Sequence, residues 1–132
     1  MNKLLFDSFA LLRFFYREPG AEKVKRLLEE SLKNGQARLI NAINVGELVY
    51  ITQRRFGEQA KLRTLMHLQS LEFTILPCPN DLIFRAAELK ARYPISYADA
   101  FALASAIEHA ADLVTGDPEF RQVEHLVKVV WV

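Results

Sequence analysis

The chain has 132 residues, of which 51% are hydrophobic and 25% are charged, and its formal net charge is +1. This length fits one domain over residues 1–132, and the composition excludes a long disordered tail. A charge near zero excludes a globally basic nucleic-acid binder, so affinity for phosphates would need a local basic cluster. The single cysteine excludes an internal disulfide, and no apolar run reaches the roughly 18 residues of a membrane span. We expect a cytoplasmic protein.

The first half of the chain alternates short apolar runs with longer amphipathic segments. Glu18-Pro19-Gly20 ends the first helical segment, and Gly35 and Gly57 mark the ends of two others, because glycine is favoured just after a last helical turn. Helices 44–56 and 58–70, which follow each other almost directly, should form a hairpin that projects from the sheet. In chain order the predicted elements are strand 3–6, helix 8–16, helix 22–34, strand 37–40, helix 44–56 and helix 58–70.

The second half continues the same alternation. Asn80 is the predicted N-cap of the next helix, and Pro94 separates that helix from an alanine-rich one. The predicted elements are strand 72–76, helix 81–92, helix 97–110, strand 113–115 and strand 127–132. Strands that alternate with helices predict a three-layer α/β fold, with a parallel sheet whose strand ends converge on one edge.

Four acidic residues stand where a charge is unexpected. Asp7 and Asp117 fall just beyond predicted strands, Asp99 lies on the alanine-rich helix, and Glu47 lies inside helix 44–56. Because the carboxyl ends of parallel strands share one edge of the sheet, we expect Asp7 and Asp117 to lie close together.

Three of these acids also have a structural interpretation. Asp7 and Asp117 are suitable N-caps, and Pro118 follows Asp117 at the first helical position, where proline is favoured. Ser96 and Asp99 resemble a capping box, in which an acid follows the cap by three residues. Taken one at a time, Asp7 and Asp117 are better explained by helix capping than by metal binding, and Asp99 is explained equally well by either.

Glu47 has no such role at a helix end. Its neighbours at helical spacing are apolar, and an unpaired carboxylate there is costly. Arg54, two turns further on, is the structural partner to be weighed against a metal ion. Acids without a nearby His or Cys suit a hard divalent cation, Mg²⁺ or Mn²⁺. The chemistry this predicts is phosphodiester hydrolysis, in which one ion, or two roughly 4 Å apart, activates water.

The sequence resembles the PIN-domain ribonucleases of the VapC toxin type over its whole length. The motifs are Phe6-Asp7-Ser8, Gly46-Glu47-Leu48, Tyr97-Ala98-Asp99-Ala100-Phe101-Ala102 and Thr115-Gly116-Asp117-Pro118-Glu119-Phe120. The resemblance implies the strand order 3-2-1-4-5, with the crevice between the first and fourth strands. One departure is Phe9, where the family more often has a small residue.

The resemblance also implies roles for particular residues. The catalytic and metal-binding acids would be Asp7, Glu47, Asp99 and Asp117, holding Mg²⁺ or Mn²⁺. Ser8 and Thr115 would supply supporting hydroxyls, which hold an acid or a metal-bound water. The family further implies an RNA substrate, a small antitoxin as partner and a homodimer.

Arg13 and Arg17 are possible RNA contacts, because they stand one turn apart and would follow Asp7 along the first helix. Solvated surface arginines are the alternative interpretation.

The function expected from the sequence is therefore that of a Mg²⁺- or Mn²⁺-dependent endoribonuclease, the toxin of a type II toxin–antitoxin pair. Two alternatives stay open: RNA processing without a toxin role, and a catalytically silent PIN-like binding module. A phosphoacceptor signalling domain is disfavoured, because Asp7 has no adjacent acid and Lys128 lies inside the last predicted strand. A phosphatase of the Asp-x-Asp kind is disfavoured because residue 9 is Phe.

Overall fold

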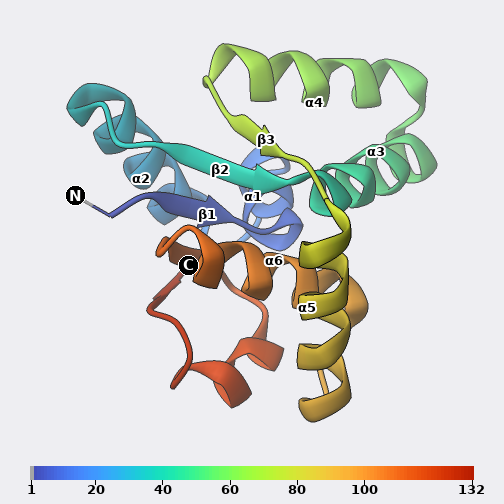
Figure 1. The fold of residues 1–132 in the computed structure, drawn as a ribbon. Coiled ribbons are helices and arrows are strands. Elements are labelled where there is room, and N and C mark those ends of the chain that lie inside the picture. The colour runs from blue at the N-terminus through green and yellow to red at the C-terminus, as the bar shows by residue number, and fades with distance from the viewer. Residues whose placement is uncertain (1) are drawn as a thin grey trace.

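The computed structural model describes residues 2–132, and it places a parallel five-stranded sheet between two layers of helices (Figure 1). The strand order is β3-β2-β1-β4-β5, which confirms the predicted order 3-2-1-4-5 and the three-layer α/β class. β1 lies at the centre and pairs with both β2 and β4. The strands are β1 (Leu4–Phe6), β2 (Arg38–Asn41), β3 (Thr74–Leu76), β4 (Asp112–Thr115) and β5 (Val129–Trp131).

The helices follow the predicted order, with one short addition after β4. This addition is a 3₁₀ helix, η1 (Pro118–Val123), which begins at the predicted Asp117 cap with proline at its first position. The α-helices are α1 (Ser8–Phe15), α2 (Ala21–Asn34), α3 (Ala42–Phe56), α4 (Glu58–Ser70), α5 (Asn80–Arg92) and α6 (Tyr97–Glu108).

Three predicted helix starts differ from the observed ones, and α2 begins only one residue earlier than predicted. α3 begins two residues early, because the side chain of Asn41 accepts a hydrogen bond from the backbone N–H of Ile43 at 2.8 Å. The prediction that Asn80 is an N-cap is wrong, since Asn80 is already helical. Pro79 takes the cap position in an extended conformation, and its carbonyl accepts the N–H groups of Leu82 and Ile83 at 3.0 and 3.1 Å.

The core has two parts, one on each face of the sheet, because successive strand residues point to opposite faces. Leu5, Leu39 and Leu113 pack on the side of α5 and α6. Their neighbours along the same strands pack on the side of α1 to α4, and these are Leu4, Phe6, Ile40 and Val114. Every residue from Asp99 to Ala106 is buried, so α6 is covered on all sides.

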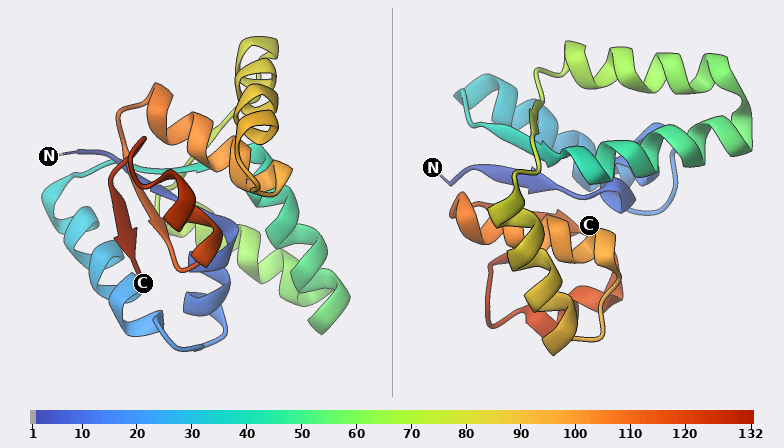
Figure 2. Two further views of the ribbon diagram at one scale, coloured as in Figure 1. Left: turned by 90° about the horizontal axis from the view of Figure 1, so that it is seen from below. Right: turned by 45° about the vertical axis from the view of Figure 1, so that its right-hand side comes forward.

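α3 and α4 form the predicted hairpin, which extends beyond the sheet (Figures 1 and 2). Gly57 connects them at φ +92°, a conformation that residues with a side chain rarely adopt. Among the residues that the structure describes, no helix is long and apolar enough to cross a membrane.

Gly116, between Thr115 and Asp117, has no room for a side chain. A Cβ atom there would lie 2.8 Å from Nη1 of Arg13 and 2.9 Å from the carbonyl oxygen of Val132. We expect Gly116→Ala to lower the free energy of unfolding by about 1–3 kcal/mol through this overpacking. Denaturant unfolding measures the change.

Gly46→Ala is the matched control, because a Cβ atom on that helical glycine meets nothing within 4 Å. This substitution should raise the free energy of unfolding by about 0.5–1 kcal/mol, since alanine loses less conformational entropy in a helix. Equal effects of the two substitutions would show that the close approach at Gly116 is unimportant.

Candidate metal centre between β1 and β4

The ends of β1 and β4 are joined by a buried hydrogen-bond chain. Asp7 follows β1 and caps α1, accepting the backbone N–H of Ala10 at 2.8 Å with Oδ1. The hydroxyl of Thr115, the last residue of β4, donates to the other oxygen of Asp7. The backbone N–H of Asp117 donates in turn to this hydroxyl at 3.0 Å. Two acids 110 positions apart in the sequence are thereby held at the point where the strand order reverses.

Glu47 reaches the same region from α3. Its Oε1 accepts hydrogen bonds from the hydroxyl of Ser8 at 2.8 Å and from Nδ2 of Asn44 at 3.1 Å. The alternative partner, Arg54, lies instead over the ring of Tyr50, with 5.5 Å between the guanidinium carbon and the ring centre. The ion pairs found within residues 2–132 include neither Glu47 nor Arg54, so that alternative is wrong.

Asp99 lies in the first turn of α6, where it is only 8% exposed. Ser96 caps this helix as predicted and accepts the backbone N–H of Asp99 at 3.1 Å. The reciprocal bond of the capping box is absent from this pair, because the N–H of Ser96 donates to Oε1 of Glu119 at 2.7 Å. Glu119 thus takes over the capping function, and the carboxylate of Asp99 is left to face other groups.

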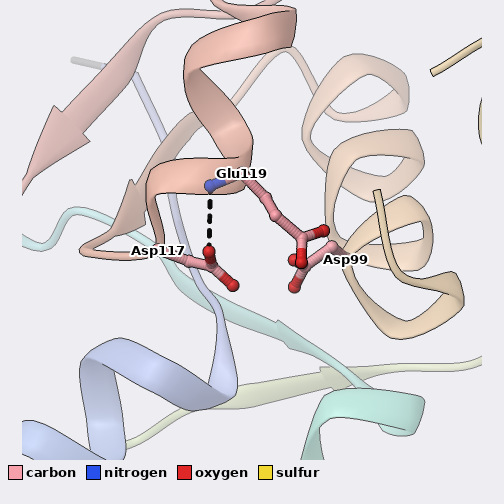
Figure 3. Close-up of side chains that lie close together, drawn as sticks. All are labelled: Asp99, Asp117 and Glu119. Atoms are coloured by element: carbon pink, nitrogen blue, oxygen red, sulfur yellow. Dashed lines mark hydrogen bonds between the residues drawn. The ribbon is translucent and has the colours of Figure 1, made fainter. Parts of the chain in front are cut away.

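Asp99, Asp117 and Glu119 form a cluster in which one oxygen of each lies within 4.8 Å of the others. Figure 3 shows the three side chains meeting between α6 and the start of η1, where the N–H of Glu119 donates to Asp117 at 2.9 Å. Glu119 is not among the site residues expected from the sequence. Its position two residues after Asp117, in the first turn of η1, was the available signal.

Burial raises the pKa values of two of the acids. Desolvation raises the pKa of Asp7 to about 7, although hydrogen bonds from Thr115 and Ala10 act in the opposite direction. Desolvation also raises the pKa of Asp99 to about 9, and the nearby charges of Asp117, Asp7 and Glu119 add to the effect. In the protein without a cation, these carboxyl groups therefore retain protons that exposed acids would lose.

The donor set fits a hard divalent cation. All its ligand atoms are oxygens, and Oδ2 of Asp99 is buried without a hydrogen-bond partner in the described part of the chain. None of the ion pairs found in residues 2–132 involves Asp7, Glu47, Asp99 or Asp117. A bound cation would compensate this negative charge, which no arginine or lysine pairs with in these residues.

The two arginines predicted as RNA contacts differ in position. Arg13 lies on α1, with its guanidinium 4.5 Å from the ring centre of Phe9 and its Nη1 donating to the carbonyl of Val132 at 3.0 Å. Arg17 is exposed and lies beyond the end of α1, at φ +52°. Placing both on one helix was therefore wrong, and their contact with RNA stays a prediction.

An acid-lined edge at the switch point of a five-stranded parallel sheet defines a PIN-like α/β domain. The sequence pattern of the PIN domain family matches residues 4–126, so the chain belongs to that family. Among curated proteins, none matches the chain.

The solved structures that resemble this chain include proteins of toxin–antitoxin pairs. VapBC2 from Rickettsia felis, solved with a promoter DNA fragment, has a TM-score of 0.79 and 21% identity over 98% of each chain. A toxin–antitoxin complex from Klebsiella pneumoniae has a TM-score of 0.72 and 26% identity, over 98% of this chain and 100% of that one. VapC20 from Mycobacterium tuberculosis, a sarcin–ricin loop cleaving toxin, has a TM-score of 0.74 and 17% identity, over 92% of this chain and 95% of that one.

The raised pKa of Asp99 predicts a dependence of stability on pH. The folded protein holds this proton up to about pH 9, whereas an unfolded Asp loses it near 3.8. The contribution of this proton to the free energy of unfolding is therefore complete below about pH 4, and it is lost as the pH rises toward 9. We expect Asp99→Asn to raise the Tm of chelator-treated protein by at least about 3 °C near pH 8, and by less near pH 5. Calorimetry at both pH values measures this.

Asp112→Asn is the matched control, because Asp112 is equally buried at 8% exposure. Its carboxylate accepts Nδ2 of Asn2 at 3.0 Å and lies 3.7 Å from Nζ of Lys128, so neutralising it removes favourable contacts. Its Tm should not rise. A Tm for Asp99→Asn at or below that of the unaltered protein at both pH values would contradict the assignment.

Proposed function

We propose that this PIN domain is a Mg²⁺- or Mn²⁺-dependent endoribonuclease that acts in the cytoplasm as the toxin of a type II toxin–antitoxin pair. The observation that carries the proposal is the convergence of buried and half-buried acids at the carboxyl ends of β1 and β4, none of which pairs with an arginine or lysine in residues 2–132. PIN domains are typically metal-dependent nucleases. The similarity to the toxin VapC20 supports the choice of RNA as the substrate.

The proposed metal-binding and catalytic residues are Asp7, Glu47, Asp99 and Asp117. A divalent ion bound there would supply Lewis-acid chemistry, activating water and neutralising charge on the scissile phosphate. Ser8 and Thr115 orient two of these acids, because each hydroxyl donates to a carboxylate oxygen. Oδ2 of Asp99, buried without a partner in residues 2–132, is the oxygen most in need of a cation. Arg13 is the more suitable of the two proposed RNA contacts, since it lies against Gly116.

The proposed partners are an antitoxin and a second copy of the chain. Exposed apolar side chains along α3 and α4 support both, and they include Tyr50, Phe56, Leu62 and Met66. A hollow of about 910 Å³ between the α1–α2 connection and α4 offers further apolar surface, lined in part by Phe14, Phe15 and Leu71. Several similar structures contain toxin and antitoxin together.

The test is cleavage of a mixed RNA pool with Mg²⁺, with Mn²⁺ and with chelator, followed by mapping of the cut ends. We expect metal-dependent cleavage that Asp7→Asn lowers more than a hundredfold, because loss of a residue that only hydrogen-bonds to a metal ligand already costs about 10–100-fold. Asp112→Asn, a buried acid on the opposite end of β4, should keep the activity.

Full activity of Asp7→Asn would contradict the site assignment. Metal binding without cleavage of any RNA would indicate the silent binding module. Cleavage without growth arrest on expression in bacteria would indicate RNA processing and not a toxin.

A further inference from the structure

Asn44 is a buried polar residue that helix capping does not explain. It lies on α3 one turn before Glu47 and is 0% exposed. Its Nδ2 donates to Oε1 of Glu47 at 3.1 Å and to the carbonyl oxygen of Ala98 at 3.3 Å. Its Oδ1 is buried and has no hydrogen-bond partner in residues 2–132. The unsatisfied oxygen carries a desolvation cost, which offsets much of what the two hydrogen bonds of this amide contribute to stability.

The orientation of this amide follows from its surroundings. Both contacted groups, a carboxylate and a carbonyl, are acceptors only. Exchanging the nitrogen and oxygen would direct Oδ1 at two other oxygens and lose both hydrogen bonds. The unpartnered atom is therefore the amide oxygen.

The two hydrogen bonds of Asn44 connect the elements that carry two of the proposed metal ligands. Ala98 directly precedes Asp99, so the amide links the side chain of Glu47 to the first turn of α6. The hydroxyl of Ser8, next to Asp7, donates to the same Oε1 of Glu47. With Oε1 held by two donors, Oε2 is the oxygen left for a ligand.

Asn44 differs from other buried polar residues in residues 2–132, and the difference supports a role for it at the candidate metal centre. Only two buried side-chain nitrogen or oxygen atoms in residues 2–132 have no hydrogen-bond partner. They are Oδ1 of Asn44 and Oδ2 of Asp99, and both residues lie at the candidate metal centre. Thr52, an equally buried polar residue on the same helix, donates instead to the carbonyl of Leu48 at 2.6 Å. Its polar group is satisfied within its own helix.

We propose that Asn44 is a positioning residue, which fixes the orientation of Glu47 and its separation from Asp99 and so sets the affinity of the site for a divalent cation. This inference rests on the proposed function of the same acids. Asn44 touches neither the cation nor RNA in this proposal and acts only through Glu47 and the backbone before Asp99.

The test replaces Asn44 with leucine, which has a similar size and no polar atoms. We expect Asn44→Leu to weaken Mn²⁺ binding, measured by calorimetry, by about tenfold or more. At limiting Mn²⁺ the kcat for RNA cleavage should fall by a similar factor, while KM for RNA stays within about twofold. The Tm of the chelator-treated variant should equal or exceed that of the unaltered protein, because a half-satisfied amide is removed.

Thr52→Val is the matched control, since it removes an equally buried polar group from the same helix away from the acids. It should leave the Mn²⁺ affinity unchanged. Should Asn44→Leu fail to fold, Asn44→Ala permits the same comparison of metal affinity, because it too removes the amide donor.

The possible outcomes distinguish a failure of the positioning role of Asn44 from a failure of the proposed nuclease function. If the unaltered protein binds Mn²⁺ and cleaves RNA but the Asn44 variants bind Mn²⁺ equally well, the positioning role is overturned and the proposed function stands. If Thr52→Val weakens Mn²⁺ binding as much as Asn44→Leu, the role is merely structural and the inference fails. If the unaltered protein neither binds Mn²⁺ nor cleaves RNA, the proposed function fails and the inference with it.

Discussion

The hydrogen bond from the hydroxyl of Thr115 to Asp7 is the interaction on which the arrangement of the site depends. It joins the carboxyl ends of β1 and β4, the central pair of strands where the chain reverses its direction of winding. Both residues are almost fully buried, so the hydroxyl and the carboxylate must satisfy each other. The same hydroxyl accepts the N–H of Asp117, which fixes where the chain leaves β4. One buried polar contact thus fixes the relative positions of the two strand ends.

Helix capping and the gathering of acids turn out to be compatible uses of the same residues. Asp7 and Asp117 each use Oδ1 to accept a backbone N–H group at a helix start, and each has a second oxygen. Asp99 is freed more completely, because Glu119 bonds the N–H of Ser96 in its place. Capping therefore positions these carboxylates without consuming them. For Asp7 and Asp117, the capping interpretation and the metal-binding interpretation are both consistent with this geometry.

This gathering of acids costs stability in the protein without a cation. Burial and mutual repulsion raise the pKa values of Asp7 and Asp99, so protons are retained where an unfolded chain would release them. The hydrogen bonds to Asp7 from Thr115 and Ala10 offset only part of this penalty. A fold that was selected only for stability would replace such groups with apolar ones. These buried acids, together with the half-satisfied amide of Asn44, form a site whose polar groups lower the stability of the fold.

The amino-acid sequence predicts the α/β alternation, the caps at Asp7, Ser96 and Asp117 and, through family resemblance, the strand order and the proposed set of four metal-binding acids. These follow from local periodicity, from residue preferences at helix ends and from short motifs. The contacts around those acids follow from the tertiary structure alone: Ser8 and not Arg54 bonds Glu47, Glu119 bonds the N–H of Ser96, and Asn44 bonds the carbonyl of Ala98. These three contacts join residues 39, 23 and 54 positions apart, across different elements. Local patterns carry no information about such pairs, because the packing of α1, α3, α6 and η1 around the strand ends creates them.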